Sequence, residues 1–241
     1  MNALSGKRVW LTRSEEGNRA WEAPIRAAGA EPLSCATLRF RTLVENAETL
    51  QNAVESADWV VFTSPRGVRS WLELGLRTQP ATRIAVVGQS TAEACRAAIA
   101  NPTCVATNAS ASSLASDLLA ISDWKSVALI GAQESRPELH DALRVAHKDV
   151  RVVASYETEV HAPATSAQSL QAGDAIFLAS PSAFEALLAA DWQLDRAHLI
   201  SIGPTTSHSI RAAGLPVAAE SETRTVQGML NAWAQILQQT P

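Results

Sequence analysis

Short apolar runs recur along the chain, and polar or small residues flank each of them. The runs cover residues 8–11, 58–62, 84–87, 127–130, 175–178 and 199–202. Continuous runs of this length are typical of strands buried on both faces, as in a parallel sheet. Two of the intervening segments place apolar residues at helical spacing: Val68, Trp71 and Leu72 in one, Phe184, Leu187 and Leu188 in the other. Strands that alternate with helices predict a doubly wound α/β architecture.

Two stretches of the sequence recur later in the chain. Residues 62–68 (FTSPRGV) correspond to 178–184 (LASPSAF), and residues 86–91 (VVGQST) correspond to 201–206 (SIGPTT). The paired serines lie 116 residues apart and the paired glycines 115 residues apart. Two matches at almost the same spacing predict two copies of one βαβα unit.

Two further stretches alternate in the manner of exposed strands, residues 37–44 and 152–160. If both cross between lobes, the middle of the chain forms one lobe and the two ends form the other. We therefore predict two similar doubly wound parallel-sheet domains joined by a two-stranded antiparallel linker. The expected ranges are a discontinuous domain of residues 1–36 plus 161–241, an inserted domain of residues 45–151, and linker strands at 37–44 and 152–160.

Composition narrows the class of protein. A chain of 241 residues with 46% hydrophobic residues can build such a core in two domains. The formal net charge of −4 argues against a nucleic-acid partner, because such proteins are usually basic. The sequence lacks an apolar leader, an 18-residue apolar run and a sustained heptad pattern. We expect a soluble, cytoplasmic monomer without a membrane partner.

Metal and nucleotide chemistry find little support in the sequence. The three cysteines form no C-x-x-C pair, and the five histidines form no H-x-x-x-H or Cys/His cluster. The glycine-rich phosphate loops of nucleotide-binding proteins are also missing. We expect free thiols in a reducing compartment, no metal and no nucleotide cofactor.

Two Ser-Pro pairs each end a predicted strand and begin a predicted helix. Serine is a favoured N-cap and proline suits the first helical position, so Ser64-Pro65 and Ser180-Pro181 fit helix starts. The first turn of a helix offers unpaired N–H groups and partial positive charge, which suit an anion. Helix capping alone is the alternative interpretation.

The two glycine loops repeat this pattern. Gly88 precedes Ser90 and Thr91, as Gly203 precedes Thr205 and Thr206. Glycine lets backbone approach a ligand closely, and the hydroxyls can cap the helix or bind an anion. Ligands of open α/β sheets bind beyond the carboxyl ends of the strands, where all four loops belong. Two facing lobes would present several helix N-termini to a ligand with several carboxylates or phosphates.

Two other side chains are candidates for chemistry. Tyr156, the only tyrosine, lies in the second predicted linker. It could donate a proton or hydrogen bond to a leaving hydroxyl, or pack between lobes. Arg13 ends the first predicted strand after Thr12, and it could pair with a substrate carboxylate or remain solvated.

These motifs, in this order and spacing, resemble the uroporphyrinogen-III synthase family over nearly the whole chain. The matching segments are Leu11-Thr12-Arg13, Phe62-Thr63-Ser64-Pro65, Val87-Gly88-x-Ser90-Thr91, Ser155-Tyr156-x-Thr158, Ala179-Ser180-Pro181-Ser182 and Ile202-Gly203-Pro204-Thr205-Thr206. The resemblance implies two α/β lobes and a reaction that needs no metal or organic cofactor. Hydroxymethylbilane, a linear tetrapyrrole with eight carboxylates, loses its terminal hydroxyl, inverts ring D through a spirocyclic intermediate and closes to uroporphyrinogen III.

The resemblance also implies roles for residues. Tyr156 matches the linker tyrosine of the family and is expected to assist departure of the hydroxyl. The expected substrate-binding residues are Thr12, Arg13, Thr63, Ser64, Gly88, Ser90, Thr91, Arg136, Ser180, Ser182, Gly203, Thr205 and Thr206. Ile130 departs from the family, which often carries arginine before the glycine at this strand end, and Arg136 could supply the missing charge.

Two other functions fit the same features. One is a two-lobed binding protein that closes on a polyanionic small molecule without chemistry. The other is a catalytically lapsed relative with a regulatory role. A product assay separates the enzyme from both.

Overall fold

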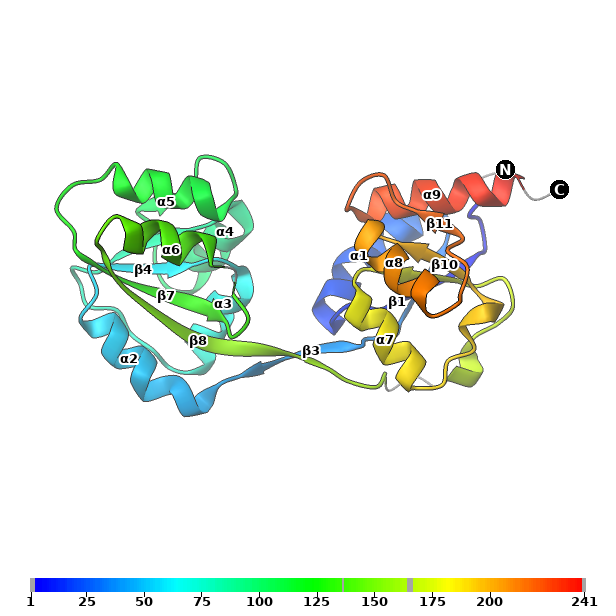
Figure 1. The fold of residues 1–241 in the computed structure, drawn as a ribbon, viewed down its shortest axis with the longest axis horizontal. Helices are drawn as coiled ribbons and strands as arrows, with labels where there is room; N and C mark the ends of the chain where they lie inside the picture. Colours follow the sequence, from blue (N-terminus) through cyan, green and yellow to red (C-terminus); the bar gives the residue numbers. More distant parts are fainter. Residues whose placement is uncertain (1–2, 136, 164–166, 240–241) are drawn as a thin grey trace. The chain divides into compact units, whose positions relative to one another are not determined.

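The computed structural model describes residues 3–135, 137–163 and 167–239, and the chain divides into two compact units. Unit 1 contains residues 1–39 and 159–241, and unit 2 contains residues 40–158. Each unit has a mainly parallel sheet with helices on both faces (Figure 1). The predicted α/β class with two doubly wound domains is confirmed.

The sheet of unit 2 has the order β3-β8-β7-β4-β5-β6. The strands are β3 (Leu38–Thr42), β4 (Trp59–Phe62), β5 (Arg83–Val86), β6 (Cys104–Val105), β7 (Ser126–Ala132) and β8 (Asp149–Val160). The helices are α2 (Ala47–Glu55), α3 (Pro65–Glu73), α4 (Gln89–Ala98), α5 (Ala111–Leu119) and α6 (Glu138–Val145), with a 3₁₀ turn at Val44–Asn46. The central strand β4 pairs in parallel with β5 and β7, so it lies in the interior of the sheet.

Alternate residues of β4 build the two cores of unit 2. Val60 and Phe62 pack with α2, α3 and α4, and Trp59 and Val61 pack with α5 and α6. All four β4 residues are fully buried. The continuous apolar run in the sequence therefore reflects burial on both faces of the sheet.

Unit 1 has the sheet order β11-β10-β9-β1-β2, and all of its pairings are parallel. The strands are β1 (Arg8–Leu11), β2 (Glu31–Ser34), β9 (Ala175–Leu178), β10 (His198–Ser201) and β11 (Ala219–Glu220). The helices are α1 (Glu15–Ala27), α7 (Pro181–Ala189), α8 (Pro204–Ala212) and α9 (Val226–Gln239), with 3₁₀ turns at Ala167–Ser169 and Leu194–Arg196.

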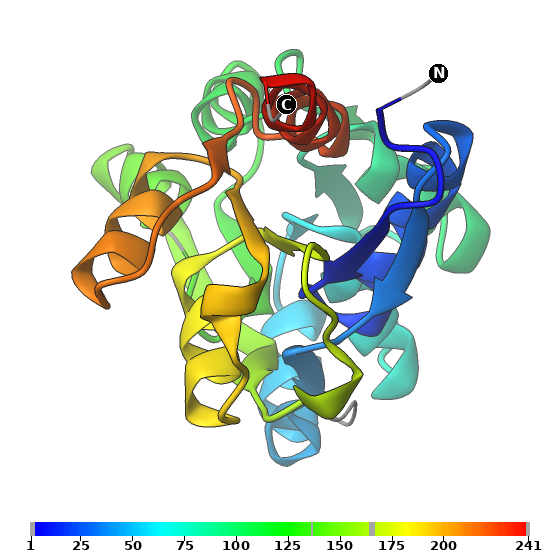
Figure 2. The ribbon, with the colours of Figure 1, turned by 90° about the vertical axis from the view of Figure 1, so that its right-hand side faces the viewer.

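The helices of unit 1 also cover both faces of its sheet. Helices α7 and α8 lie side by side on one face of the sheet (Figure 2). In the core beneath them, Phe184 and Ile210 pack with Trp10 and Ile176. Helices α1 and α9 cover the other core, in which Trp233 packs edge-on against Phe177 at 5.8 Å between ring centroids. Large aromatic side chains therefore fill the core on each face of this sheet.

The two units share one topology. Reading outward from β9 in unit 1 and from β4 in unit 2, each sheet has two strands on one side, and two main strands on the other. The helix after β9 packs beside the helix after β10, as α3 packs beside α4. The two units differ in the order in which the chain forms equivalent strands. In unit 1, β1 and β2 come before the central strand β9, whereas in unit 2 the corresponding β7 and β8 come after β4. The recurring sequence motifs therefore occupy equivalent strand ends.

Strands β3 and β8 both run across the boundary between the units, and they pair with each other. Ion pairs join Arg39 to Glu159 and Arg41 to Glu157. Since a later residue of β3 faces an earlier residue of β8, the two strands run antiparallel. The structure extends the second predicted linker strand: β8 begins at Asp149, and its first half pairs in parallel with β7. Residues 152–156 are therefore part of the unit 2 sheet as well as of the crossing strand.

Candidate active site

The helix starts at the carboxyl ends of β4 and β9 have the same local geometry. Ser64 and Ser180 are extended, with φ of −154° and −161°, and each hydroxyl oxygen accepts a hydrogen bond from the amide three residues ahead at 3.2 Å. Proline occupies the first helical position in both. The Ser180 hydroxyl also lies 3.0 Å from that of Ser182. The capping role predicted for both serines is present in both units.

The two glycine loops differ in their backbone. Gly88 has φ of +97°, where a side chain is strained, whereas Gly203 is extended and needs no glycine for conformational reasons. After these glycines, Ser90 and Thr205 are exposed, but Thr91 and Thr206 are 2% exposed. Ser90 and Thr205 are therefore the accessible hydroxyls of these loops.

A pocket of about 210 Å³ lies in unit 1 at the carboxyl ends of its strands. It is lined by Ala179, Ser180, Pro181, Ile202, Gly203, Thr205, Thr206 and Arg224. We call it the Arg224 pocket. It brings together Ser180, Gly203, Thr205 and Thr206, four of the predicted binding residues. Sequence reasoning missed Arg224, because its place beside the two repeated loops depends on the tertiary structure.

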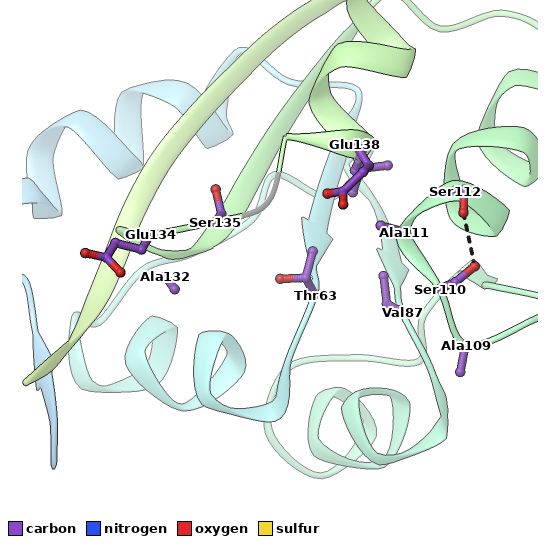
Figure 3. A pocket seen from close by; sticks show the side chains of 11 residues that line it. Thr63, Val87, Ala109, Ser110, Ala111, Ser112, Ala132, Glu134, Ser135 and Glu138 are labelled. Carbon is purple, nitrogen blue, oxygen red and sulfur yellow. Dashed lines mark hydrogen bonds between the residues drawn. The ribbon is translucent and has the colours of Figure 1, made fainter. Parts of the chain in front are cut away.

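Unit 2 has a larger pocket of about 500 Å³ at its own strand ends, the Thr63 pocket. Figure 3 shows Thr63 at the end of β4, and Glu138 and Ser110 among the surrounding side chains. Glu134 also lines this pocket. The predicted Thr63 thus has access to a cavity, but carboxylates that sequence reasoning did not single out share it.

Tyr156 lies on β8 and contacts the start of α3. Its hydroxyl is 3.1 Å from the Ser64 hydroxyl oxygen, and its ring packs edge-on against Phe40 at 5.7 Å. The residue is 7% exposed. Ser155, the preceding residue, forms a buried 2.6 Å hydrogen bond with Ser70 of α3. The tyrosine is therefore held by contacts from β3, β8 and α3.

Arg66 supports this cluster from α3. Its guanidinium lies 5.7 Å from the Phe40 ring centroid and 5.9 Å from that of Tyr156. It donates to both carboxylate oxygens of Glu73, at 3.0 and 2.8 Å, and to the Thr42 hydroxyl at 2.6 Å. The charge of Arg66 is therefore already paired within the protein.

Thr12 and Arg13 have protein partners at the end of β1. The Thr12 side chain is fully buried and donates to the Phe177 carbonyl at 2.8 Å, so its hydroxyl proton is already used within the protein. Arg13 donates to the Gly17 carbonyl at 3.1 Å and stacks on Trp21 at 4.6 Å. Burial lowers the pKa of Arg13 from its ordinary value. Arg136, another predicted substrate-binding residue, lies outside the described residues.

The cysteines are free thiols within the fold. Burial, with the Glu15 carboxylate as a second cause, raises the pKa of Cys35 to about 12, and burial raises the pKa of Cys95 to about 11. Burial, followed by the Asp117 carboxylate, also raises the pKa of Cys104. Neutral pH therefore leaves these thiols protonated and poorly nucleophilic.

Two negative findings apply to residues 3–135, 137–163 and 167–239. In these ranges, no group of three His, Cys, Asp or Glu side chains is placed to hold a metal ion. None of the helices within them combines the length and apolar character needed to cross a bilayer.

Known proteins resemble this chain in sequence pattern and in fold. The family model described as uroporphyrinogen-III synthase HemD matches residues 19–231. The uroporphyrinogen-III synthetase of Helicobacter pylori has a TM-score of 0.60 at 18% identity, covering 94% of this chain and 97% of that one. A mutant uroporphyrinogen III synthase of the extremely thermophilic bacterium Thermus thermophilus has a TM-score of 0.52 at 19% identity, covering 97% and 100%.

No curated protein matches the sequence. The solved structures are distant enough in sequence that they establish the fold alone. The family model establishes more than the fold, because its match spans most of the chain and includes the loops that form both pockets. This chain belongs to the uroporphyrinogen-III synthase family, the lyase-type enzymes that cyclise hydroxymethylbilane in heme biosynthesis.

Proposed function

We propose that this protein converts hydroxymethylbilane to uroporphyrinogen III, with inversion of ring D and loss of water, and that Tyr156 assists the departing hydroxyl. The observation that carries the role of Tyr156 is its hydroxyl contact with Ser64 at the start of α3. A tyrosine held this way is a positioned donor, and hydroxide is a poor leaving group unless it receives a proton or hydrogen bond.

The hydrogen bonds of Ser64 allow it to be the donor to Tyr156. Ser64 Oγ accepts from the Gly67 amide, and its own proton remains to be donated. When Ser64 donates to Tyr156 Oη, the phenol keeps its own proton, which it can donate to the leaving hydroxyl of the substrate. Ser64 is then a positioning residue and Tyr156 the catalytic donor.

We also propose that the carboxylates of the substrate are held at the strand-end loops. Ser180 and Thr205 supply accessible polar groups in unit 1, and Ser90 supplies one in unit 2. The first turns of α7 and α8 add unpaired backbone amides, which favour anions. Holding the flexible bilane folded favours ring inversion over the spontaneous closure that leaves ring D unchanged.

The finer expectations on assembly and compartment remain proposals. We propose a cytoplasmic monomer that uses neither a metal nor a nucleic-acid partner. The net charge of −4 supports the absence of a nucleic-acid partner, and the free cysteines fit a reducing compartment.

The deciding experiment measures the product. Hydroxymethylbilane is generated in situ, the protein is added, and the oxidised porphyrin isomers are separated by chromatography. Mainly type III isomer is the expected result. Type I isomer alone, formed at the spontaneous rate, would overturn the proposal and favour a binding or lapsed regulatory protein.

A further inference from the structure

Arg224 lies on a short loop whose conformation is fixed by its neighbours. The loop joins β11 to α9. Ser221 Oγ donates to the Thr223 carbonyl at 2.5 Å, and the Thr225 amide donates to the same carbonyl at 2.7 Å. Thr225 Oγ1 accepts from the Gly228 amide at 3.1 Å, which caps the start of α9. The backbone on both sides of Arg224 is therefore held by hydrogen bonds.

Gly228 fits the helix tightly against this loop. A Cβ built on Gly228 would lie 2.6 Å from the Thr223 carbonyl oxygen, and closer still to Ser221 Oγ and Thr223 Oγ1. We expect Gly228→Ala to lower the urea concentration at the midpoint of unfolding, because the added methyl group overpacks this contact. Urea denaturation measures the change. Gln227→Ala, at the neighbouring exposed position, is the control and should leave this midpoint nearly unchanged.

The Arg224 side chain is exposed and lines the pocket described above. A Cβ on Gly203 would lie 3.9 Å from Arg224 Nε, which puts the guanidinium beside the start of α8. Among the described residues, Arg224 has no hydrogen bond or ion pair to the protein. Arg66 differs, because Glu73 already neutralises it, and Arg13 differs because it stacks on Trp21.

The chemistry of the pocket matches a carboxylate. Its remaining lining is neutral, with hydroxyls on Ser180 and Thr205. A guanidinium presents parallel N–H donors that match the two oxygens of a carboxylate. The described lining of the Thr63 pocket carries Glu134 and Glu138 instead and no cation. Of these two pockets, the one in unit 1 is better suited to an acidic side chain of the substrate.

We propose that Arg224 binds a carboxylate side chain of the tetrapyrrole in this pocket and so contributes to substrate affinity. This inference rests on the proposed function for the identity of the substrate. The role is one of binding and positioning, so it affects KM more than kcat.

Three variants test the proposal. Arg224→Met removes the charge but keeps much of the apolar part of the side chain. Arg224→Lys keeps the charge but loses the parallel N–H donors of the guanidinium. Arg211→Met removes an exposed arginine in the last turn of α8, outside the pocket, and is the matched control. Circular dichroism should show all three variants folded, because Arg224 has no protein partner among the described residues and Arg211 is exposed. Arg224→Gln serves as the replacement if the methionine variant does not fold.

Two readouts are used with each variant. The first is the KM and kcat for hydroxymethylbilane formed in situ. The second is the dissociation constant of uroporphyrin III, an octacarboxylate probe, from quenching of tryptophan fluorescence. We expect Arg224→Met to raise KM and this dissociation constant about 5- to 30-fold, as for the loss of a charge-assisted hydrogen bond at an exposed site. Arg224→Lys should recover part of the loss, and Arg211→Met should resemble the wild type. Added KCl should weaken probe binding less in Arg224→Met than in the wild type.

Failure of this inference can be told from failure of the proposed function. If the wild type forms type III product and Arg224→Met has unchanged KM and probe affinity, only the role of Arg224 is overturned. If the wild type forms type I product alone, the proposed function fails, but the dissociation constant of uroporphyrin III still tests whether Arg224 binds a carboxylate. Weaker probe binding by Arg224→Met then supports a carboxylate site, and equal binding rejects it.

Discussion

Replacing Tyr156 by phenylalanine should lower kcat about 100-fold, the low end of the range for one positioned acid, while KM changes little. The low end is expected because loss of the hydroxyl from the bilane is intrinsically easy and control of its conformation dominates the reaction. Phenylalanine keeps the edge-on contact with Phe40 and removes only the hydroxyl that meets Ser64. Single-turnover measurement of type III formation separates the chemical step from product release.

The Ser64 contact supplies the control for this prediction. Ser64→Ala removes the group that orients the phenol, so it should lower kcat less than Tyr156→Phe does. In the double variant the combined effect should be smaller than the sum of the two, because both act through one hydrogen bond. An unchanged kcat in Tyr156→Phe would exclude the catalytic role, and full additivity would exclude the orienting role of Ser64.

The second large effect is expected from a negative charge in the Arg224 pocket. Ser180→Asp should lower kcat/KM roughly 30-fold, because the new carboxylate repels a substrate carboxylate at short range and solvent screens part of the repulsion. Aspartate is as good an N-cap as serine, so the start of α7 should be preserved. Steady-state kinetics at low ionic strength measures the effect.

Ser180→Asn is the matched control, since asparagine has the size and capping ability of aspartate without the charge. It should change kcat/KM only a few-fold. Equal loss in both variants would show that shape, and not charge, matters at this position. Recovery of Ser180→Asp activity with added KCl would support the electrostatic reason.

Local patterns predicted the fold of each unit well. The apolar run at Trp59–Phe62 indicated a strand buried on both faces, and the structure buries all four side chains. Serine followed by proline predicted the starts of α3 and α7, because capping depends on a few adjacent residues. The repeated loops likewise led to equivalent strand ends. These features are local, so a linear sequence contains them.

The functional side chains were harder to predict, since their partners come from distant parts of the chain. The sequence by itself determined the α/β class, the two repeated units, the helix starts and the family resemblance. Only the tertiary structure decided that Thr12 donates to Phe177, that Glu73 neutralises Arg66, and that Arg224 lies beside Gly203 without a protein partner among the described residues. The physical reason is that hydrogen bonds and charge pairing depend on which side chains meet in space, and hydrophobic periodicity does not encode those meetings.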